Sequence, residues 1–445
     1  MTKVTYRRLS LLILALLTGC GLFSDEGGTA TPPTATARPT TIGTPSGTPL
    51  AGTPSFAPVQ DDTMTLVMWT NEDYAPDSKF KGGEELINQI QGFEQDHDMH
   101  VEVILKKRSG AGGLFDFLTT ASIAASSVLP DLITLSAYDL YRAAQTNLVQ
   151  PLDDLVSPEL LDDQFDFATT LTQLEGTTLG VLYQADLQHL VYDTTAAEQA
   201  PRSWNDLYES EISFVFAPAA PSDGVNDVIL TQYLSLGGEL KDASGQPHLD
   251  VERLTQALEF FQQARQNDVV PVSVLELTDA SNAWDIYRFS DAGMAQVRAS
   301  SYLADRDGLN NTSFGYVPLD IAGATTVGHG WALAIVTQDP ERQKMAAALI
   351  EHLLSLENNG TWTLNAGRLP ARYSTFEMWD QDDPYLPFIR NLLAQAKPAP
   401  DPHLAAVVGG PLVEALTNVL NGQATPAEAA QAAAQAVAQA VEAER

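Results

Sequence analysis

Short apolar runs alternate with longer segments of helical periodicity after residue 62 of this chain. An apolar run at residues 65–69 precedes a helical pattern at 84–93, and a valine-rich run follows at 101–105. Strands and helices joined in this order by short connections are typical of an α/β fold with a parallel sheet. The order continues with a predicted helix at 114–125, a buried strand at 131–135, a helix at 139–144, and later strands at 180–182, 213–216, 294–298, 314–317 and 331–335.

Two helix starts carry capping signals. Ser203 precedes Asp206 by three residues, and Thr425 precedes Glu428 in the same way, with a proline at the first helical position of the second helix. The alanine-rich C-terminal segment has strong helix propensity. Val437 and Val441 stand four residues apart within it, so we expect this helix to dock onto the body of the protein.

Composition limits the number of domains and the partners. The folded part of the 445-residue chain is longer than one core usually supports, which predicts two lobes. The formal net charge is -33, from 24 basic and 57 acidic residues, which argues against nucleic acid as a partner. The acidity also disfavours contact with anionic lipid, apart from a covalent anchor.

The first 20 residues have the features of an export signal. Lys3, Arg7 and Arg8 precede an apolar stretch at residues 9–17 that is too short to cross a bilayer. The sequence Leu-Thr-Gly-Cys that ends at Cys20 resembles the bacterial lipobox. The resemblance implies removal of signal peptide 1–19, lipidation of Cys20 and a lipid-anchored protein outside the cytoplasm. The alternative is a short N-terminal helix with a buried cysteine.

Residues 20–60 are expected to be a stalk. From residue 27 to about residue 60 the chain is dominated by Thr, Pro, Gly, Ala and Ser and has almost no large apolar residue, so it cannot build a core. Its prolines favour an extended conformation, and about 34 residues at about 3.1 Å each would reach on the order of 100 Å.

Several motifs occur in an order that resembles one protein family. The segments are Leu129-Pro130-Asp131-Leu132, residues 147–154 (NLVQPLDD), 201–207 (PRSWNDL), 330–335 (GWALAI), 366–371 (AGRLPA) and 421–429 (NGQATPAEA). Together they resemble the extracellular solute-binding proteins of ABC importers, in the sugar-binding group that includes maltose-binding protein. Leu182 and Asp193 depart from the family pattern, which has proline and asparagine at these places.

The resemblance implies an α/β, two-lobed periplasmic-binding-protein-like fold of type II, with a cleft between the lobes and a hinge of crossover segments. We assign residues 62–184 plus 319–356 to lobe 1 and residues 186–316 plus 358–440 to lobe 2. The implied function is capture of a mono- or oligosaccharide by lobe closure and delivery to the transmembrane subunits of an ABC permease. The resemblance implies a monomer that needs no cofactor and catalyses no reaction.

Candidate ligand-binding residues follow predicted strands or stand at the expected lobe crossing. Aromatic faces suit the apolar faces of sugars, and carboxylate, amide and guanidinium groups suit their hydroxyls. The glycines at 328 and 330 would let the backbone beside Trp331 approach a ligand closely. The candidates are Trp69, Asn71, Glu72, Tyr138, Tyr183, Asp186, Tyr302, Trp331 and Arg368.

Each candidate also has an interpretation without a ligand. The aromatic side chains could pack inside a lobe, Asp186 could be an exposed hinge acid, and Arg368 could pair with a surface carboxylate. His97 and His100 stand close together beside acidic residues, but a solvent-exposed turn is the expected setting there and no metal site is predicted.

Other functional classes stay open at this point. A binding protein for a polyamine, a phosphodiester or a peptide would have the same fold, and a surface scaffold that has lost transport could retain it. A glycan-processing enzyme would need paired carboxylates at a fixed separation. The sequence contains no G-x-S-x-G, P-loop or HExxH motif.

Overall fold

The computed structural model describes residues 64–444, except 76–77, 79–80, 220–223 and 321–323. The expected signal peptide 1–19, Cys20 and the stalk 20–60 lie outside the described residues. The larger sheet has six strands, in the order β12-β11-β3-β1-β2 with β6 also paired to β11. The strands are β1 (Thr65–Asn71), β2 (His100–Lys106), β3 (Leu132–Ser136), β6 (Val181–Asp186), β11 (Val327–Ile335) and β12 (Lys397–Pro398).

The larger sheet is mixed, which corrects the expectation of a parallel sheet. β1 runs parallel to β2 and β3, as predicted. β11 comes from the last third of the chain and runs antiparallel to both β3 and β6. Its apolar run fits either direction, because a strand buried on both faces has the same composition whichever way it runs.

The smaller sheet has four strands, in the order β10-β7-β9-β8. They are β7 (Gln188–Asp193), β8 (Phe214–Val215), β9 (Met294–Arg298) and β10 (Thr312–Gly315). The sequence did not predict β7, and β10 begins two residues before its expected position. A short hairpin of β4 (Gln173–Leu174) and β5 (Thr177–Thr178) forms a third sheet.

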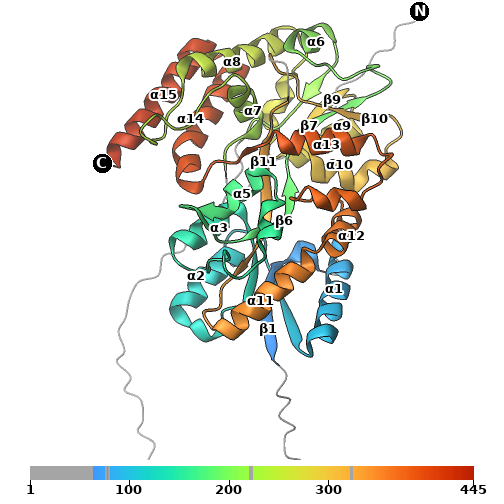
Figure 1. Ribbon diagram of the computed structural model, residues 1–445. Coiled ribbons are helices and arrows are strands. Elements are labelled where there is room, and N and C mark those ends of the chain that lie inside the picture. Colours follow the sequence, from blue (N-terminus) through green and yellow to red (C-terminus); the bar gives the residue numbers. More distant parts are fainter. Residues whose placement is uncertain (1–63, 76–77, 79–80, 220–223, 321–323, 445) are drawn as a thin grey trace, which may run out of the picture. The chain divides into compact units, whose positions relative to one another are not determined.

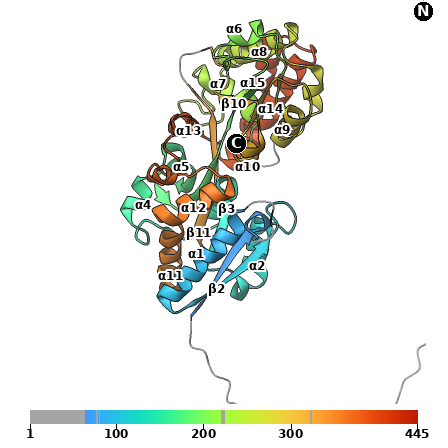
Figure 2. The same cartoon turned by 90° about the vertical axis from the view of Figure 1, so that its right-hand side faces the viewer.

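Helices surround the two sheets at different ends of the folded unit (Figures 1 and 2). Both views place α1, α2 and α11 with the larger sheet and α6, α8, α14 and α15 at the opposite end. The helices are α1 (Gly82–His97), α2 (Leu114–Ala124), α3 (Ala137–Gln145), α4 (Pro158–Asp162), α5 (Asp166–Thr172), α6 (Trp204–Glu209), α7 (Asp227–Ser235), α8 (Val251–Gln266), α9 (Ala280–Phe289), α10 (Ala299–Asp305), α11 (Pro340–Leu353), α12 (Leu356–Ala366), α13 (Tyr385–Ala394), α14 (Pro402–Leu420) and α15 (Pro426–Ala443). Short 3₁₀ turns are η1 (Glu72–Tyr74), η2 (Ser126–Val128), η3 (Val272–Glu276), η4 (Arg306–Gly308) and η5 (Ser374–Met378).

The predicted helix caps and the docking of the C-terminal helix are confirmed. Ser203 and Thr425 each form a reciprocal capping box with the acidic residue three positions later. Val437 and Val441 are buried where α15 packs against α14 and α8. The terminal helix therefore belongs to the core of the folded unit.

Within the described residues, α14 is the one helix long and apolar enough to cross a membrane. Its Val408, Leu412 and Leu416 are completely buried against the rest of the protein. These contacts identify α14 as a core helix.

An ion pair joins the larger sheet to α11. Asp131 lies immediately before β3, and its carboxylate accepts hydrogen bonds from Arg342 Nε at 2.7 Å and from Arg342 Nη2 at 2.5 Å. The same carboxylate accepts the Val67 amide of β1 at 2.8 Å, and Arg342 Nη2 also donates to the Thr65 carbonyl at 2.7 Å. One buried carboxylate thus connects β1, β3 and α11.

We predict that Asp131→Asn lowers the free energy of unfolding by about 3 kcal/mol, because removing the charge leaves a partly buried guanidinium without its partner. Chemical denaturation of both proteins measures the difference. Glu341→Gln is the matched control, since Glu341 pairs with Lys344 on the same helix at 2.7 Å but both side chains are exposed. That change should cost less than about 1 kcal/mol, and an equal loss in both variants would contradict the prediction.

A buried histidine lies inside the smaller-sheet half of the protein. His189 of β7 has no exposed surface, and its Nδ1 lies 2.9 Å from the Leu190 carbonyl. Its Nε2 lies 3.1 Å from the Tyr385 hydroxyl. This arrangement fits a neutral ring that donates from Nδ1 and accepts at Nε2. Burial lowers the pKa of His189 to about 4.

We predict that His189 makes the protein less stable as the pH falls from about 6.5 to about 4. In this interval the unfolded chain binds a proton at His189 and the folded protein does not, so up to about 3 kcal/mol is lost. Thermal unfolding of His189→Gln across this pH range should show a shallower slope, whatever its absolute stability. His403→Gln, at a half-exposed histidine of α14, should keep the wild-type slope, and parallel slopes in all three proteins would refute the assignment.

Candidate functional site

The two sheets are joined at Leu187, between the end of β6 and the start of β7. Asp186 accepts hydrogen bonds from the Ser300 amide at 3.2 Å and from the Ser300 hydroxyl at 2.7 Å. The Leu187 amide donates to the same carboxylate at 3.0 Å, and Arg298 Nη1 lies 3.9 Å from it. The sequence placed Asp186 at the crossing, and the structure surrounds it with groups from the end of β9 and the start of α10.

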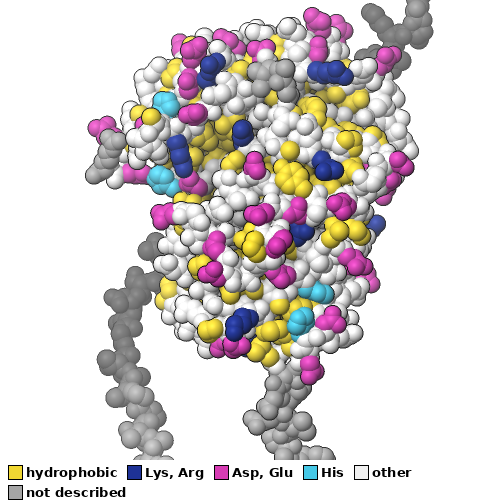
Figure 3. Space-filling view, viewed as in Figure 1, with side chains coloured by type: hydrophobic (Ala, Val, Ile, Leu, Met, Phe, Trp, Pro, Cys, Tyr) yellow, Lys and Arg dark blue, Asp and Glu magenta, His cyan; other side chains and the backbone are white. Residues whose placement is uncertain are grey.

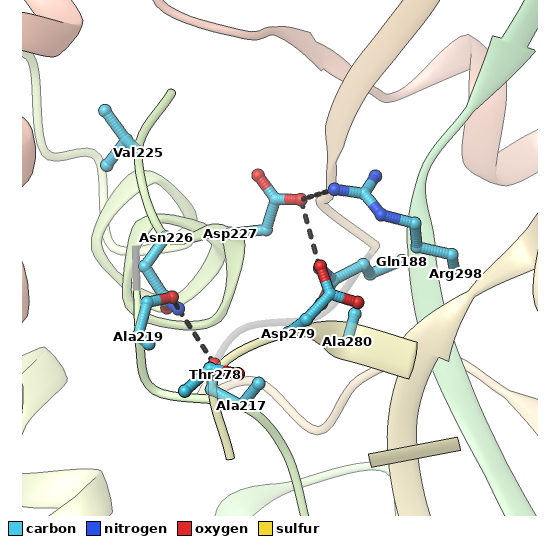
Figure 4. Close-up of a pocket in the computed structure, with 10 residues that line it drawn as sticks. All are labelled: Gln188, Ala217, Ala219, Val225, Asn226, Asp227, Thr278, Asp279, Ala280 and Arg298. Atoms are coloured by element: carbon cyan, nitrogen blue, oxygen red, sulfur yellow. Dashed lines mark hydrogen bonds and ion pairs between the residues drawn. The ribbon is translucent and has the colours of Figure 1, made fainter. Parts of the chain in front are cut away.

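A small pocket lies beside this crossing (Figure 4). Its volume of about 30 Å³ is roughly that of one water molecule. Figure 4 shows the side chains of Asp227, Asp279 and Arg298 gathered around it. The lining residues are Gln188, Ala217, Ala219, Val225, Asn226, Asp227, Thr278, Asp279, Ala280 and Arg298.

Asp227 is a buried carboxylate at the first position of α7. It accepts a hydrogen bond from Gln188 Nε2 at 3.1 Å and lies 2.9 Å from His329 Nε2 and 4.0 Å from Arg298. Burial alone would raise the pKa of Asp227, but His329, Arg298 and Gln188 outweigh burial and lower it. Asp227 is therefore a charged acceptor, and it connects α7 to β11 through His329.

Asp279 is the N-cap of α9, and its carboxylate accepts the Ser281 amide at 2.7 Å. Burial opposes ionisation, but the hydrogen bonds from Ser281 and the charges of Arg298 and Arg108 lower the pKa of Asp279. The influence of Arg108 is informative, because Arg108 follows β2 in the larger sheet. Charged groups from both sheets therefore act on one another.

The carboxyl ends of β1 and β2 add a second group of side chains. Arg108 donates to Asp73 Oδ2 at 3.1 Å, and its guanidinium lies 4.9 Å from the ring centre of Trp331. Trp331 stands in β11 opposite Ser136 of β3 and Gln184 of β6. The sequence proposed Trp331 at the start of a strand, but β11 begins at Val327, so Trp331 lies in the middle of the strand, beside the Arg108 guanidinium.

Arg368 lies close to these groups and is mostly buried. Burial lowers the pKa of its guanidinium, and the charges of Asp186 and Asp73 act in the opposite direction. Tyr183 is also buried, with its ring centre 4.3 Å from Trp362. Among the described residues, the hydroxyl groups of Tyr74 and Tyr183 have no hydrogen-bond partner.

Three candidates near the end of β1 have different environments. Trp69 is buried in the core, edge-on to Phe117, which fits the packing interpretation. Asn71 is also buried and caps η1 by accepting the Asp73 amide at 2.9 Å. Glu72 is exposed. Ligand contact by these three side chains stays a prediction.

The two remaining aromatic candidates pack against other side chains. Tyr138 on α3 is half-buried and lies near Arg142, at 5.9 Å. Tyr302 on α10 is buried, with ring centres 5.5 Å from His189 and 5.2 Å from Tyr385. Ligand contact by either tyrosine also stays a prediction.

The glycines beside Trp331 allow tight packing within the protein. A Cβ on Gly328 would lie 2.4 Å from the ring of Phe167. A Cβ on Gly330 would lie 2.6 Å from Leu182 and 2.7 Å from the Gln184 carbonyl. We expected these glycines to let the backbone approach a ligand, but the close approach observed is to α5 and β6.

Sequence reasoning missed Arg108, Asp227, Asp279, Arg298 and His329 as site residues. Arg108 had the same signal as Asn71 and Glu72, since it follows a strand parallel to β1 and therefore lies at the same edge of the sheet. No local signal marks the pair of Asp227 and His329, which are 102 residues apart in the chain.

The described part of the chain contains no group of three His, Cys, Asp or Glu side chains suited to a metal ion. His100 Nδ1 instead lies 2.6 Å from Glu94, and His97 stacks on Phe93.

Comparisons with known proteins identify the family and the fold of this chain. A model of the bacterial extracellular solute-binding protein family matches residues 88–406. No curated protein matches the sequence.

Among solved structures, maltose-bound MalE3 of T. maritima is 20% identical, with a TM-score of 0.67 over 84% of this chain and 98% of that one. The cyclic alpha-maltosyl-1,6-maltose binding protein of Arthrobacter globiformis is 17% identical, with a TM-score of 0.71 over 85% and 99%. The sugar-binding protein MalE of Xanthomonas citri is 17% identical, with a TM-score of 0.71 over 86% and 98%.

These structures share the two-lobed type II fold, and the match extends over nearly their whole length. With the family match over most of the folded part, the conclusion is plain: this chain belongs to the bacterial extracellular solute-binding proteins and has their type II fold.

Proposed function

We propose that this protein is the solute-binding lipoprotein of an ABC importer and that it captures a mono- or oligosaccharide between its lobes. Family membership already implies a location outside the cytoplasm. Delivery of the captured sugar to a membrane permease is the step that gives the binding protein its role. The protein acts as a monomer and does not turn over its ligand.

The observation that carries the proposal is the group of arginine and aspartate side chains beside the crossing between the two sheets, together with Trp331. Arg298 and Arg368 provide hydrogen-bond donors, and acceptors come from Asp73, Asp186, Asp227 and Asp279. Sugar hydroxyls donate and accept hydrogen bonds, so a lining with both kinds of group suits them, and an indole ring suits the apolar face of a sugar.

The near balance of these charges also argues against the alternatives. With Arg108, which pairs with Asp73, three arginines stand against the four aspartates, and the aspartates already pair with arginine, histidine or backbone amides. A polyamine would need an excess of uncompensated acid, and a phosphodiester would need an excess of cationic donors. A neutral polyol needs neither. The solved relatives named above bind maltose or a cyclic maltosyl sugar, which agrees with this choice.

We propose the lobe boundaries given from the sequence, 62–184 plus 319–356 and 186–316 plus 358–440. The division of strands supports them, since β1, β2, β3, β6 and β11 share one sheet and β7 to β10 share the other. β12 extends the larger sheet although its residues belong to the second set. Closure would then bend the chain near Leu187, where Asp186 is held by Ser300.

The ligand proposal predicts that a glycan raises the free energy of unfolding. Trp331→Ala should raise the dissociation constant for that glycan at least tenfold. Full-length protein in a non-glycosidic detergent is heated with maltose, maltotriose, monosaccharides, spermidine and glycerophosphodiesters in turn. A ligand at about 100 times its dissociation constant should add about 2.7 kcal/mol to the free energy of unfolding. Trp204→Ala is the control, because Trp204 stacks on Phe260 and donates to Gln232, both outside the proposed site.

A shift with spermidine or a phosphodiester, and none with any sugar, would retain the binding function and overturn the carbohydrate assignment. Release of shortened sugars from a bound glycan would instead identify an enzyme.

The anchor proposal predicts that Cys20→Ala moves the protein from the membrane fraction to the soluble fraction and abolishes labelling by a fatty-acid analogue. Cys20 is the only cysteine in the sequence, so no other thiol can accept the lipid. Ser24→Ala serves as the control and should remain in the membrane fraction. Retention of the Cys20→Ala protein after an alkaline wash would refute the lipid anchor.

A further inference from the structure

One face of the Trp331 ring is covered by a side chain of the protein itself. The Arg108 guanidinium lies 4.9 Å from the centre of the Trp331 ring, a distance typical of a cation–π contact. Trp331 retains only 8% of its surface exposed, whereas the side chain of Arg108 is 53% exposed. Arg108 therefore covers the ring and is itself open to solvent.

The position of Arg108 follows from the neighbouring strands. β1 and β2 are parallel and paired up to Asn71 and Lys106, so the residues just beyond them leave the sheet side by side. Asp73 follows the first strand and Arg108 the second, and the two form their ion pair at 3.1 Å. The sheet thus brings the covering arginine and its partner carboxylate together.

A glycine-containing loop carries the covering residue. Gly110 and Gly112 both have positive φ angles, and a bridge between Lys107 and Gly113 closes the loop. The loop is anchored at both ends, while the Arg108 side chain contacts Asp73 and Trp331 among the residues that the structure describes. The Arg108 side of both contacts is exposed to solvent, and an exposed cation gains little from an ion pair or from an aromatic ring.

We propose that Arg108 determines specificity by occupying the Trp331 face, so that a sugar ring must displace it to bind. This inference rests on the proposed carbohydrate function. Loss of the two weak contacts should raise the dissociation constant roughly tenfold, equivalent to about 1.4 kcal/mol. A ligand with a broad apolar ring face recovers the lost contact on Trp331, and a small or linear solute does not.

The groups around Arg108 can accommodate its displacement. Release of Arg108 exposes the Asp73 carboxylate, which can then accept a hydrogen bond from a sugar hydroxyl. Asp279 already feels the positive charge of Arg108 from the side of the smaller sheet, so a second carboxylate lies within electrostatic range. The displaced guanidinium therefore remains among acidic groups.

The affinity test compares three variants with the wild type by calorimetric titration with maltotriose, using full-length protein in a non-glycosidic detergent. Arg108→Ala should bind roughly tenfold more tightly, because the competitor for Trp331 is gone. Asp73→Asn retains the arginine, loosens its anchor and keeps an amide oxygen that can accept a hydrogen bond from a hydroxyl, so it should bind about threefold more tightly. Arg288→Ala is the matched control, since Arg288 also pairs with an aspartate, at 2.6 Å, and lies over a tryptophan, at 5.7 Å, but on α9. Its affinity should not change.

Weaker binding by Arg108→Ala would overturn the proposal, because it would mean that Arg108 holds the ligand directly. Unchanged affinity would overturn it as well, since the cover would then have no energetic effect.

A second measurement needs no ligand and separates this inference from the proposed function. Quenching of tryptophan fluorescence by acrylamide is measured with and without Trp331→Phe, so that the signal of Trp331 is obtained by difference. Removal of Arg108 should make Trp331 more accessible, and unchanged quenching would refute the cover. If neither the wild type nor Arg108→Ala binds any glycan, the carbohydrate proposal is wrong. The proposed competition between Arg108 and a sugar for Trp331 is then wrong as well. The quenching result then still decides whether Arg108 covers the ring.

Discussion

The hydrogen bonds of Asp186 fix the place where the chain passes from one sheet to the other. Its carboxylate binds Ser300 twice and the Leu187 amide once, and these contacts join the end of β6 to the start of α10. Two neighbouring backbone bonds strengthen the crossing, from Ala185 to Leu369 at 2.7 Å and from Ala299 to Leu187 at 2.9 Å. Three segments far apart in the chain therefore meet where β6 passes into β7. A carboxylate in this position can orient the sheets and also face a ligand.

β11 connects the fold to the site. The strand enters the larger sheet between β3 and β6, and Trp331 and His329 come with it. The strand fits because Gly328 and Gly330 leave room for Phe167 and Leu182. His329 then reaches Asp227 on α7, so one strand supplies both an aromatic face and a polar contact to the other side of the site. The insertion of β11 between β3 and β6 therefore both stabilises the sheet and places the candidate ligand contacts.

The balance of charge in the site differs from that of the whole protein. The chain carries a formal charge of -33, and acidic side chains are scattered over the face shown in Figure 3. In the candidate site, by contrast, Arg298 lies 3.9 Å from Asp186 and 4.0 Å from Asp227, and Arg108 pairs with Asp73 beside Trp331. Scattered surface acids keep a protein soluble, whereas buried carboxylates need partners to stay ionised. Net charge therefore describes the surface of this protein and does not describe its ligand.

The sequence by itself determined most of the order of strands and helices, the caps at Ser203 and Thr425, and the placement of Asp186 at the crossing. These features depend on short-range patterns, which a single sequence contains. Tertiary structure alone decided that β11 runs antiparallel, that Trp69 packs in the core, and that Asp227 meets His329 and Arg298. The direction of a buried strand and the meeting of side chains a hundred residues apart leave no local pattern, because both arise only when distant segments pack together.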